Sequence, residues 1–379
     1  MNLELLSEYC RSQLQPMLAC LRRAVEIESP STSKPSLDRI AAFFAHELKR
    51  VGGQVLLHHR RDAGAAVTAC FWSKRRQSKP ILILGHTDTV WDLGTLAQMP
   101  FRVRNGHAFG PGVLDMKSGI ICGLWALRAL REFRIEPSSP VRFFLTPDEE
   151  IGSRAFRTEI KREAKSARAC LVLEPAAKGG ALKTARKGVG EFRIEVQGRP
   201  AHAGIEPEAG INAITELARQ ILRIERFARP RSGLTINVGL IKGGTRPNVA
   251  PEYASAMIDV RIPALRDGAA IERKMQALKP FAPGARLKVT GGMNRPPMER
   301  RVSRRLFMKA QEIGLQLGMR LTEVSTGGGS DGNFTAALGV PTLDGLGGVG
   351  AGAHGRDEHV IVRELPRRAA LLATLIATL

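Results

Sequence analysis

The chain has 379 residues, of which 43% are hydrophobic and 25% are charged, and its formal net charge at pH 7 is +21. This composition is typical of a globular protein, and no apolar stretch approaches the ~20 residues that a transmembrane helix needs, which excludes a membrane-spanning protein. The five cysteines are scattered and form no CxxC pair, which excludes a disulfide framework and a cysteine zinc site.

The positive charge is compatible with nucleic acid, a membrane surface or anionic small molecules as partners. Basic residues are spread along the whole chain, with short groups at 73–79 and 298–305, and tyrosine and tryptophan are scarce. Without aromatic residues between the basic ones, single-stranded nucleic acid is disfavoured. We therefore expect a solvated basic surface, with no nucleic-acid or membrane partner. The first residues contain no basic segment followed by an apolar one, so we expect no secretory signal and a cytoplasmic protein with reduced thiols.

Helices and strands alternate in the first half of the chain. We expect one amphipathic helix over residues 2–27 and a second helix over 36–51, which ends at a Gly-Gly pair. Apolar runs of strand length occupy 81–84, 141–145 and 169–173, and apolar residues recur at helical spacing over 120–130. This alternation predicts an α/β fold in which helices cover both faces of the sheet.

The pattern changes near residue 188. Polar and apolar residues alternate at 190–198, 234–244 and 254–262, which predicts half-exposed strands, and 211–227 predicts a strongly amphipathic helix. After residue 297 the helix-then-strand pattern returns. We therefore expect a larger domain made of residues 1–187 and 293–379, interrupted by an inserted α+β domain at 188–292.

Side chains that can bind a metal follow three of the predicted strands. His86 follows the strand at 81–84, Glu149 and Glu150 follow the strand at 141–145, and Glu174 follows the strand at 169–173. Sites in α/β sheets form beyond the carboxyl ends of strands. Asp115 adds a further carboxylate in a glycine-rich turn before the helix at 120–130. Histidine and carboxylates without cysteine favour zinc, with manganese or cobalt as alternatives, although a solvated turn would also explain the acidic cluster at 148–150.

Six stretches of the chain together carry a family resemblance. They are 85–119, 146–153, 173–176, 198–204, 326–334 and 352–360. In this order they resemble the dinuclear zinc exopeptidases and amidohydrolases, which include aminoacylase and succinyl-diaminopimelate desuccinylase, and are most similar to the folate-cleaving bacterial glutamate carboxypeptidases. The resemblance implies a zinc-exopeptidase-like mixed sheet and an inserted smaller domain that acts in dimerisation and as a lid.

The resemblance also implies a metal centre in the larger domain. Two Zn²⁺ ions per chain, with Co²⁺ or Mn²⁺ as alternatives, would be held by His86, Asp115, Glu150, Glu174 and His354. Asp115 would bridge the ions, with His86 and Glu174 on one and Glu150 and His354 on the other. Asp88 would accept the second ring N–H of His86. Glu149 would bind no metal and would act as the general base.

Further family positions imply roles in catalysis and substrate binding. His202 would reach in from the other subunit of a homodimer and hold the developing oxyanion. Substrate-binding roles are implied for Asn248, Arg261, Arg295, Gly328 and Gly329. The arginines suit bidentate capture of a carboxylate, and the glycines suit close approach of backbone N–H groups to an anion. Arg295 would reach the substrate from the larger domain, and for both arginines a plain surface charge is the alternative.

The function that these residues imply is zinc-dependent hydrolysis of an amide bond next to a free α-carboxylate. A C-terminal amino acid, glutamate or a similar one, would be released from a small N-acyl amino acid or short peptide. A deacylase for another N-acyl amino acid or a dipeptidase is the alternative within the same class, because one methylene in a pocket changes preference by only ~1–3 kcal/mol. The alternative of a different class is a basic nucleic-acid or polyanion binder with an idle hydrolase fold.

Overall fold

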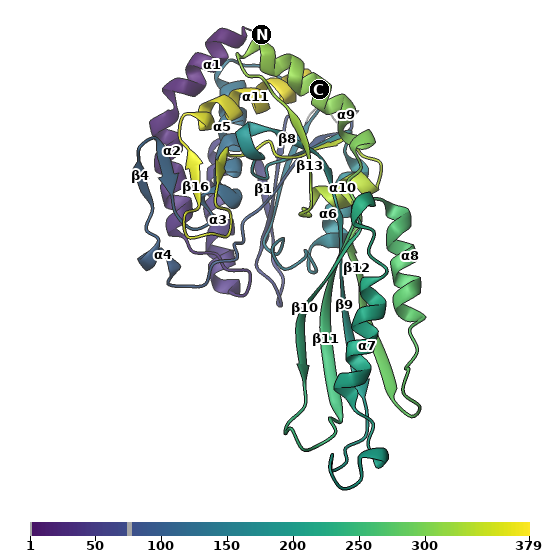
Figure 1. Ribbon diagram of the computed structural model, residues 1–379. Helices are drawn as coiled ribbons and strands as arrows, with labels where there is room; N and C mark the ends of the chain where they lie inside the picture. The colour runs from purple at the N-terminus through teal and green to yellow at the C-terminus, as the bar shows by residue number, and fades with distance from the viewer. Residues whose placement is uncertain (1, 74–77) are drawn as a thin grey trace. The chain divides into compact units, whose positions relative to one another are not determined.

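The computed structural model describes residues 2–73 and 78–379, so residues 74–77 of the basic group at 73–79 lie outside it (Figure 1). The chain divides into two compact units. The first comprises Met1–Ala185, Met298–Ser325 and Ser330–Leu379, and the second comprises Arg186–Pro297 and Thr326–Gly329. The inserted segment expected at 188–292 falls within the second unit. None of the described helices is long and apolar enough to cross a membrane.

The first unit contains helices and strands from both ends of the chain. Its helices are α1 (Leu3–Ser12), α2 (Leu14–Glu26), α3 (Lys34–Arg50), α4 (Thr95–Gln98), α5 (Ser118–Glu132), α6 (Arg157–Ser166), α9 (Arg300–Gln316), α10 (Gly332–Ala337) and α11 (Glu364–Thr378). Its strands are β1 (Gln54–His58), β2 (Ala66–Phe71), β3 (Ile81–His86), β4 (Arg102–Arg104), β5 (His107–Phe109), β6 (Val141–Thr146), β7 (Ala169–Val172), β8 (Leu182–Arg186), β13 (Glu323–Thr326), β14 (Thr342–Leu343), β15 (Gly350–Ala351) and β16 (His359–Ile361).

A six-stranded mixed sheet organises the first unit. Its strand order is β1-β2-β6-β3-β7-β14, with β6, β3, β7 and β14 parallel and with β1 and β2 added antiparallel at one edge. Alternate residues of β3 enter different cores: Ile83 packs in the cluster that includes α5 and α11, and Leu84 packs in the cluster that includes α6. Burial on both faces explains the continuous apolar run. The predicted α/β fold with helices on both faces is confirmed.

The predicted single helix at 2–27 is wrong. Two helices, α1 and α2, occupy this segment, and Gln13 between them is not helical, with φ −85° and ψ 3°. Pro16 explains the break, because proline has no N–H to donate to the carbonyl four residues earlier. Pro16 lies in the first turn of α2, where the absence of a backbone N–H donor destabilises a helix least.

The second unit is one antiparallel sheet with two helices. Its strands are β9 (Gly188–Gln197), β10 (Thr235–Gly243), β11 (Tyr253–Ile262) and β12 (Arg286–Arg295), in the order β10-β11-β9-β12. The helices α7 (Ala213–Glu225) and α8 (Leu265–Gln276) bury their apolar residues in one core with the sheet. Burial alternates strictly along β9, with Phe192, Ile194 and Val196 inside, as the sequence predicts.

Candidate metal centre

The parallel strands bring the predicted ligands to one edge of the central sheet. Strand β3 lies between β6 and β7, so their carboxyl ends are neighbours. His86 is the last residue of β3, Glu150 lies four residues beyond the end of β6, and Glu174 lies two residues beyond the end of β7. This is the place where α/β sheets form their sites.

Asp115 contacts both of the predicted histidine ligands. Its Oδ1 lies 3.3 Å from Nε2 of His86, and its Oδ2 lies 3.4 Å from Nε2 of His354. Each of two glutamates contacts one of these histidines. Glu174 Oε1 is 3.5 Å from His86 Nε2, and Glu150 Oε1 is 3.3 Å from His354 Nε2. The five side chains therefore form two neighbouring groups that share one carboxylate.

The protonation equilibria of the histidines reflect these carboxylates. Burial alone would lower the pKa of His86, but contacts with Asp115, Asp88 and Glu174 raise it well above 6.5. Contacts with Asp115 and Glu150 raise the pKa of His354 to about 10. A metal ion needs the neutral imidazole, so an ion that binds here displaces protons, and its affinity rises with pH.

The donor set fits metal ions. Asp88, Asp115 and Glu174 place carboxylate oxygens within 3.5 Å of the ring nitrogens of the buried His86. Burial and the neighbouring Asp115 charge raise the pKa of Glu150, against the lowering effect of its contact with His354. Like charges held this closely in a buried place call for a cation. Nitrogen and oxygen donors without sulfur suit zinc, cobalt or manganese.

The backbone of His354 is held in an uncommon conformation. Its φ of 63° lies in the left-handed region, which costs a non-glycine residue about 1–2 kcal/mol. The turn closes through hydrogen bonds from Gly355 N to Gly352 O (2.7 Å) and from Glu358 N to Gly355 O (3.0 Å). Strain of this kind persists where the surroundings fix the conformation, and it is frequent at functional sites.

The three acidic residues after β6 have different surroundings. Asp148 is buried, its Oδ2 accepts from the N–H of Ala155 at 2.7 Å, and burial raises its pKa to about 6. Glu150 faces His354, whereas Glu149 can place an oxygen within 4.8 Å of ligand atoms of His86 and Glu174. Glu149 is thus close enough to the metal-binding group to act as a base or as a further ligand.

Asp88 holds the turn that carries these glutamates. Its Oδ1 accepts from the N–H of Glu149 at 3.1 Å, and its Oδ2 accepts from the N–H of Glu150 at 3.0 Å. It lies behind His86 as the resemblance implies, with Oδ1 3.3 Å from Nδ1, but the backbone carbonyl of Asp88 is nearer to Nδ1 at 3.0 Å. Asp88 therefore positions both the ring of His86 and the two glutamates.

Glu358 is a positioning residue that the sequence did not indicate. Its carboxylate is buried and accepts from the backbone N–H groups of Gly112, Leu114 and Asp115 at 2.9–3.1 Å, and from Nε1 of Trp91 at 2.9 Å. These bonds fix the turn that carries Asp115. Its place four residues after His354, inside a stretch already singled out, was the one available signal.

We expect Glu358→Gln to weaken zinc binding by ~10–100-fold, as loss of a group that orients metal ligands typically does. The amide would present N–H donors to backbone donors and loosen the Asp115 turn. Zinc affinity measured by chelator competition tests this. Glu216→Gln is the matched control, because Glu216 is a buried carboxylate of the second unit that accepts from the N–H groups of Phe281 and Ala282. Equal zinc affinity in the wild type and Glu358→Gln would contradict the assigned role.

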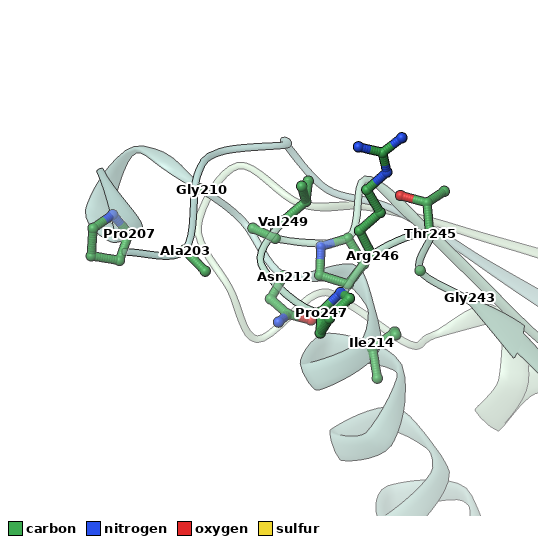
Figure 2. Close-up of a pocket in the computed structure, with 13 residues that line it drawn as sticks. Ala203, Pro207, Gly210, Asn212, Ile214, Gly243, Thr245, Arg246, Pro247 and Val249 are labelled. Atoms are coloured by element: carbon green, nitrogen blue, oxygen red, sulfur yellow. The ribbon is translucent and has the colours of Figure 1, made fainter. Parts of the chain in front are cut away.

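The remaining predicted site residues lie in the second unit. His202 is exposed, and its Nδ1 accepts from the N–H of Gly204 at 3.2 Å. Asn248 lies on the neighbouring loop, where its carbonyl accepts from the N–H of Ala203 at 3.0 Å. A pocket of about 620 Å³ opens between the loops at 203–212 and 243–251, at the start of α7 (Figure 2).

The arginines and glycines lie at the other end of this unit. Nε of Arg261 donates to Asp259 at 2.8 Å, and its Nη1 donates to the carbonyl of Gly327 at 3.4 Å. Arg295 ends β12, opposite Val189 of β9, and therefore belongs to the second unit. The prediction that it lies in the larger domain is wrong. A Cβ on Gly329 would lie 2.9 Å from Cδ of Arg295, so a larger residue there would displace the Arg295 side chain. Gly328 O accepts from Nη1 of Arg186 at 3.2 Å.

Comparisons with known proteins agree with the sequence resemblance. Residues 82–378 match the model of "Peptidase family M20/M25/M40". Carboxypeptidase G2 of Pseudomonas sp. (strain RS-16) is 31% identical over 374 residues, covering 96% of this chain and 89% of that protein. Succinyl-diaminopimelate desuccinylase of Methylorubrum populi is 28% identical, covering 92% of this chain and 95% of that protein.

Solved structures share the fold. The aminopeptidase PepT of Bacillus cereus superposes with a TM-score of 0.80 at 22% identity, covering 96% of this chain and 98% of that chain. The YXEP protein of Bacillus subtilis, described as a dinuclear metal binding peptidase, superposes with a TM-score of 0.67 at 16% identity, covering 97% and 98%. At these identities the likeness shows a common fold.

Proposed function

The chain belongs to peptidase family M20/M25/M40, and on this premise we propose that it hydrolyses an amide bond next to a free α-carboxylate and releases the C-terminal amino acid. As a member of this family it is a metal-dependent exopeptidase or amidohydrolase. Its similarity to a carboxypeptidase supports the choice of scissile bond. The contact of Asp115 with both His86 and His354 carries the proposal, because one carboxylate between two histidine-glutamate groups suits a pair of metal ions.

We assign two Zn²⁺ ions to these groups, with Co²⁺ or Mn²⁺ as alternatives. His86 and Glu174 would hold one ion, His354 and Glu150 the other, and Asp115 both. Metal ions bound there would polarise the carbonyl of the substrate and lower the pKa of a bound water towards neutrality. Asp88 and Glu358 keep the ligand-bearing turns in place through their bonds to backbone N–H groups.

Glu149 is the proposed general base. It would accept the proton of the attacking water and then give that proton to the departing amine nitrogen. The side-chain positions support this division of roles, because Glu150 Oε1 lies 3.3 Å from Nε2 of His354 whereas Glu149 groups with His86 and Glu174. Glu150 faces His354, which leaves Glu149 as the candidate for proton transfer.

His202 is the proposed oxyanion donor. Its Nδ1 accepts a hydrogen bond from the N–H of Gly204, so in the neutral ring the proton lies on Nε2, which is then a donor. We propose that it serves the site of a partner subunit in a homodimer formed through the second unit. Sedimentation that gives only monomer at working concentration would contradict this role.

Substrate recognition would use the charged and small residues of the second unit. We propose that Arg261 and Arg295 bind carboxylates of the substrate, that Asn248 donates to it, and that Gly328 and Gly329 allow close backbone approach. Free thiols at all five cysteines suit the reducing cytoplasm that we propose as its compartment.

We expect the zinc-loaded protein to release free amino acid from N-acyl amino acids and short peptides. Acidic C-terminal residues should give the highest kcat/KM in a panel that also contains aliphatic and aromatic ones. Amidation of the same substrates should lower kcat/KM by ~10–100-fold, because the arginines lose a charged acceptor. Release of N-terminal residues only, or equal rates on amidated substrates, would contradict the proposal.

A polyanion binder without catalysis is the second candidate, and the net charge of +21 favours it. It predicts steeply salt-dependent binding to duplex DNA or RNA and no bound metal. Mass spectrometry of metal content separates the two, because the enzyme should retain about two ions per chain.

A further inference from the structure

A strongly basic pocket lies in the first unit, among residues that the proposed chemistry does not use. It has a volume of about 250 Å³ and is formed by residues 179–180, 319–321, 361, 363–364 and 367–368 together with Val349. Four arginines line it, against a single carboxylate, that of Glu364. The arginines are Arg320, Arg363, Arg367 and Arg368. Such an excess of positive charge in a concave place favours an anion.

Arg368 is the central observation. It lies on α11, only 2% of its surface is exposed, and it forms no ion pair with any described residue. Its Nη2 donates to the carbonyl of Gly180, but its buried Nη1 has no hydrogen-bond partner within residues 2–73 and 78–379. A buried guanidinium with no ion pair and with an unsatisfied N–H group is costly, so its presence calls for a partner.

The side chains around Arg368 do not supply that partner. Cys122 is near, but burial raises the pKa of its thiol to about 12, so the thiol is neutral at pH 7. The charge of Glu364 raises the pKa of Arg368 without forming an ion pair with it. Oε1 of Glu364 instead lies 3.0 Å from Nη1 of Arg367 and 3.7 Å from Nε of Arg363. Burial lowers the pKa of Arg368 to about 10, which still leaves it charged.

Two exposed arginines and a helix end complete the surroundings. Arg320 makes no hydrogen bond or ion pair with the described part of the chain, and the side chain of Arg363 is 85% exposed, so both can turn towards a ligand. The pocket lies at the N-terminal end of α11, a helix of 15 residues whose dipole also favours negative charge.

We propose that this pocket binds a small, multiply charged oxyanion of the phosphate type, held by Arg368, Arg363 and Arg320. Guanidinium groups match phosphate oxygens through paired hydrogen bonds, and a tetrahedral group can accept from donors on several sides. The volume admits inorganic phosphate or the phosphate group of a small phosphomonoester. Gly180 lies six residues after Glu174, and Val349 lies five before His354, so the anion would brace two segments that carry proposed metal ligands.

Calorimetric titration of the zinc-loaded full chain with inorganic phosphate, at ionic strength held constant with chloride, tests the proposal. We expect saturable binding of one phosphate per chain at this pocket. The double variant Arg320→Gln/Arg363→Gln should bind it ~10-fold or more weakly, because two charged donors are lost. Arg368→Met should lose binding as well. Glycerol phosphate in a parallel titration distinguishes a phosphomonoester from free phosphate, by which of the two binds more tightly.

The matched control is Arg61→Gln/Arg231→Gln, which removes the same charge from two exposed positions outside the pocket. It should bind phosphate as the wild type does. Phosphate bound at the metal centre instead would compete with substrate, and its affinity would be unchanged in the Arg320→Gln/Arg363→Gln variant. That result, equal weakening in the control, or no saturable binding to the wild type would each overturn the proposal.

Discussion

Replacing Glu149 by Gln is expected to lower kcat by ~10²–10⁴-fold while the protein keeps its metal. Glutamine has the same shape but cannot accept the proton of the attacking water. The backbone N–H of residue 149 would still donate to Asp88, so the turn that carries Glu150 should stay in place. Measurement of kcat together with metal content by mass spectrometry checks this expectation.

Metal content also separates two roles that the geometry of Glu149 allows. Its carboxylate can come within 4.8 Å of ligand atoms of His86 and Glu174, so it could serve as a ligand instead of a base. Loss of metal in Glu149→Gln would identify a ligand, and full activity would remove Glu149 from the mechanism. Glu8→Gln, an exposed carboxylate on α1, is the control and should change neither quantity.

Replacing Asp115 by Asn is expected to reduce metal content to below one ion per chain and kcat/KM by ~10³-fold or more, because several kcal/mol of metal assistance are lost. Asp115 lies within 3.4 Å of both histidines of the group, through separate oxygens. An amide offers a single acceptor oxygen and no charge, so it cannot serve both sides.

Two measurements give the outcome for Asp115→Asn. Equilibrium dialysis against zinc reports the number of ions bound, and the rate of amide hydrolysis reports the chemistry. Asp62→Asn, at an exposed position in the same unit, should leave both unchanged. If Asp115→Asn still bound two ions with the affinity of the wild type, the shared-ligand arrangement would be wrong.

The sequence predicts the parallel strands of the central sheet, and the side chains that follow them, because both depend on local patterns. Strands buried on both faces appear as continuous apolar runs, and side chains after parallel strands meet at one edge of the sheet. His86, Glu150 and Glu174 illustrate this, since their contacts follow from the order β6-β3-β7. The pair β1 and β2 was not predicted, although β2 lies inside the sheet between β1 and β6 and is as long as β3.

Contacts between distant parts of the chain could not be predicted from residue patterns. Glu358 accepts from Asp115, which lies 243 residues earlier, and nothing in the spacing of either stretch indicates this bond. The sequence likewise does not show that Arg368 lacks an ion pair. This is evident only from the structure, where Gly180 and Glu364 lie around it. In so basic a chain, a single important arginine cannot be distinguished from the others by composition.

The location of bound zinc tests the proposed metal centre most directly. Crystals of the zinc-loaded protein, measured at the zinc absorption edge, should give two anomalous peaks ~3.5–4 Å apart with Asp115 between them. His86 and Glu174 should lie at ~2.0–2.2 Å from one peak, and Glu150 and His354 at the same range from the other. Absence of anomalous density among these five side chains, or zinc held only elsewhere, would contradict the proposed centre.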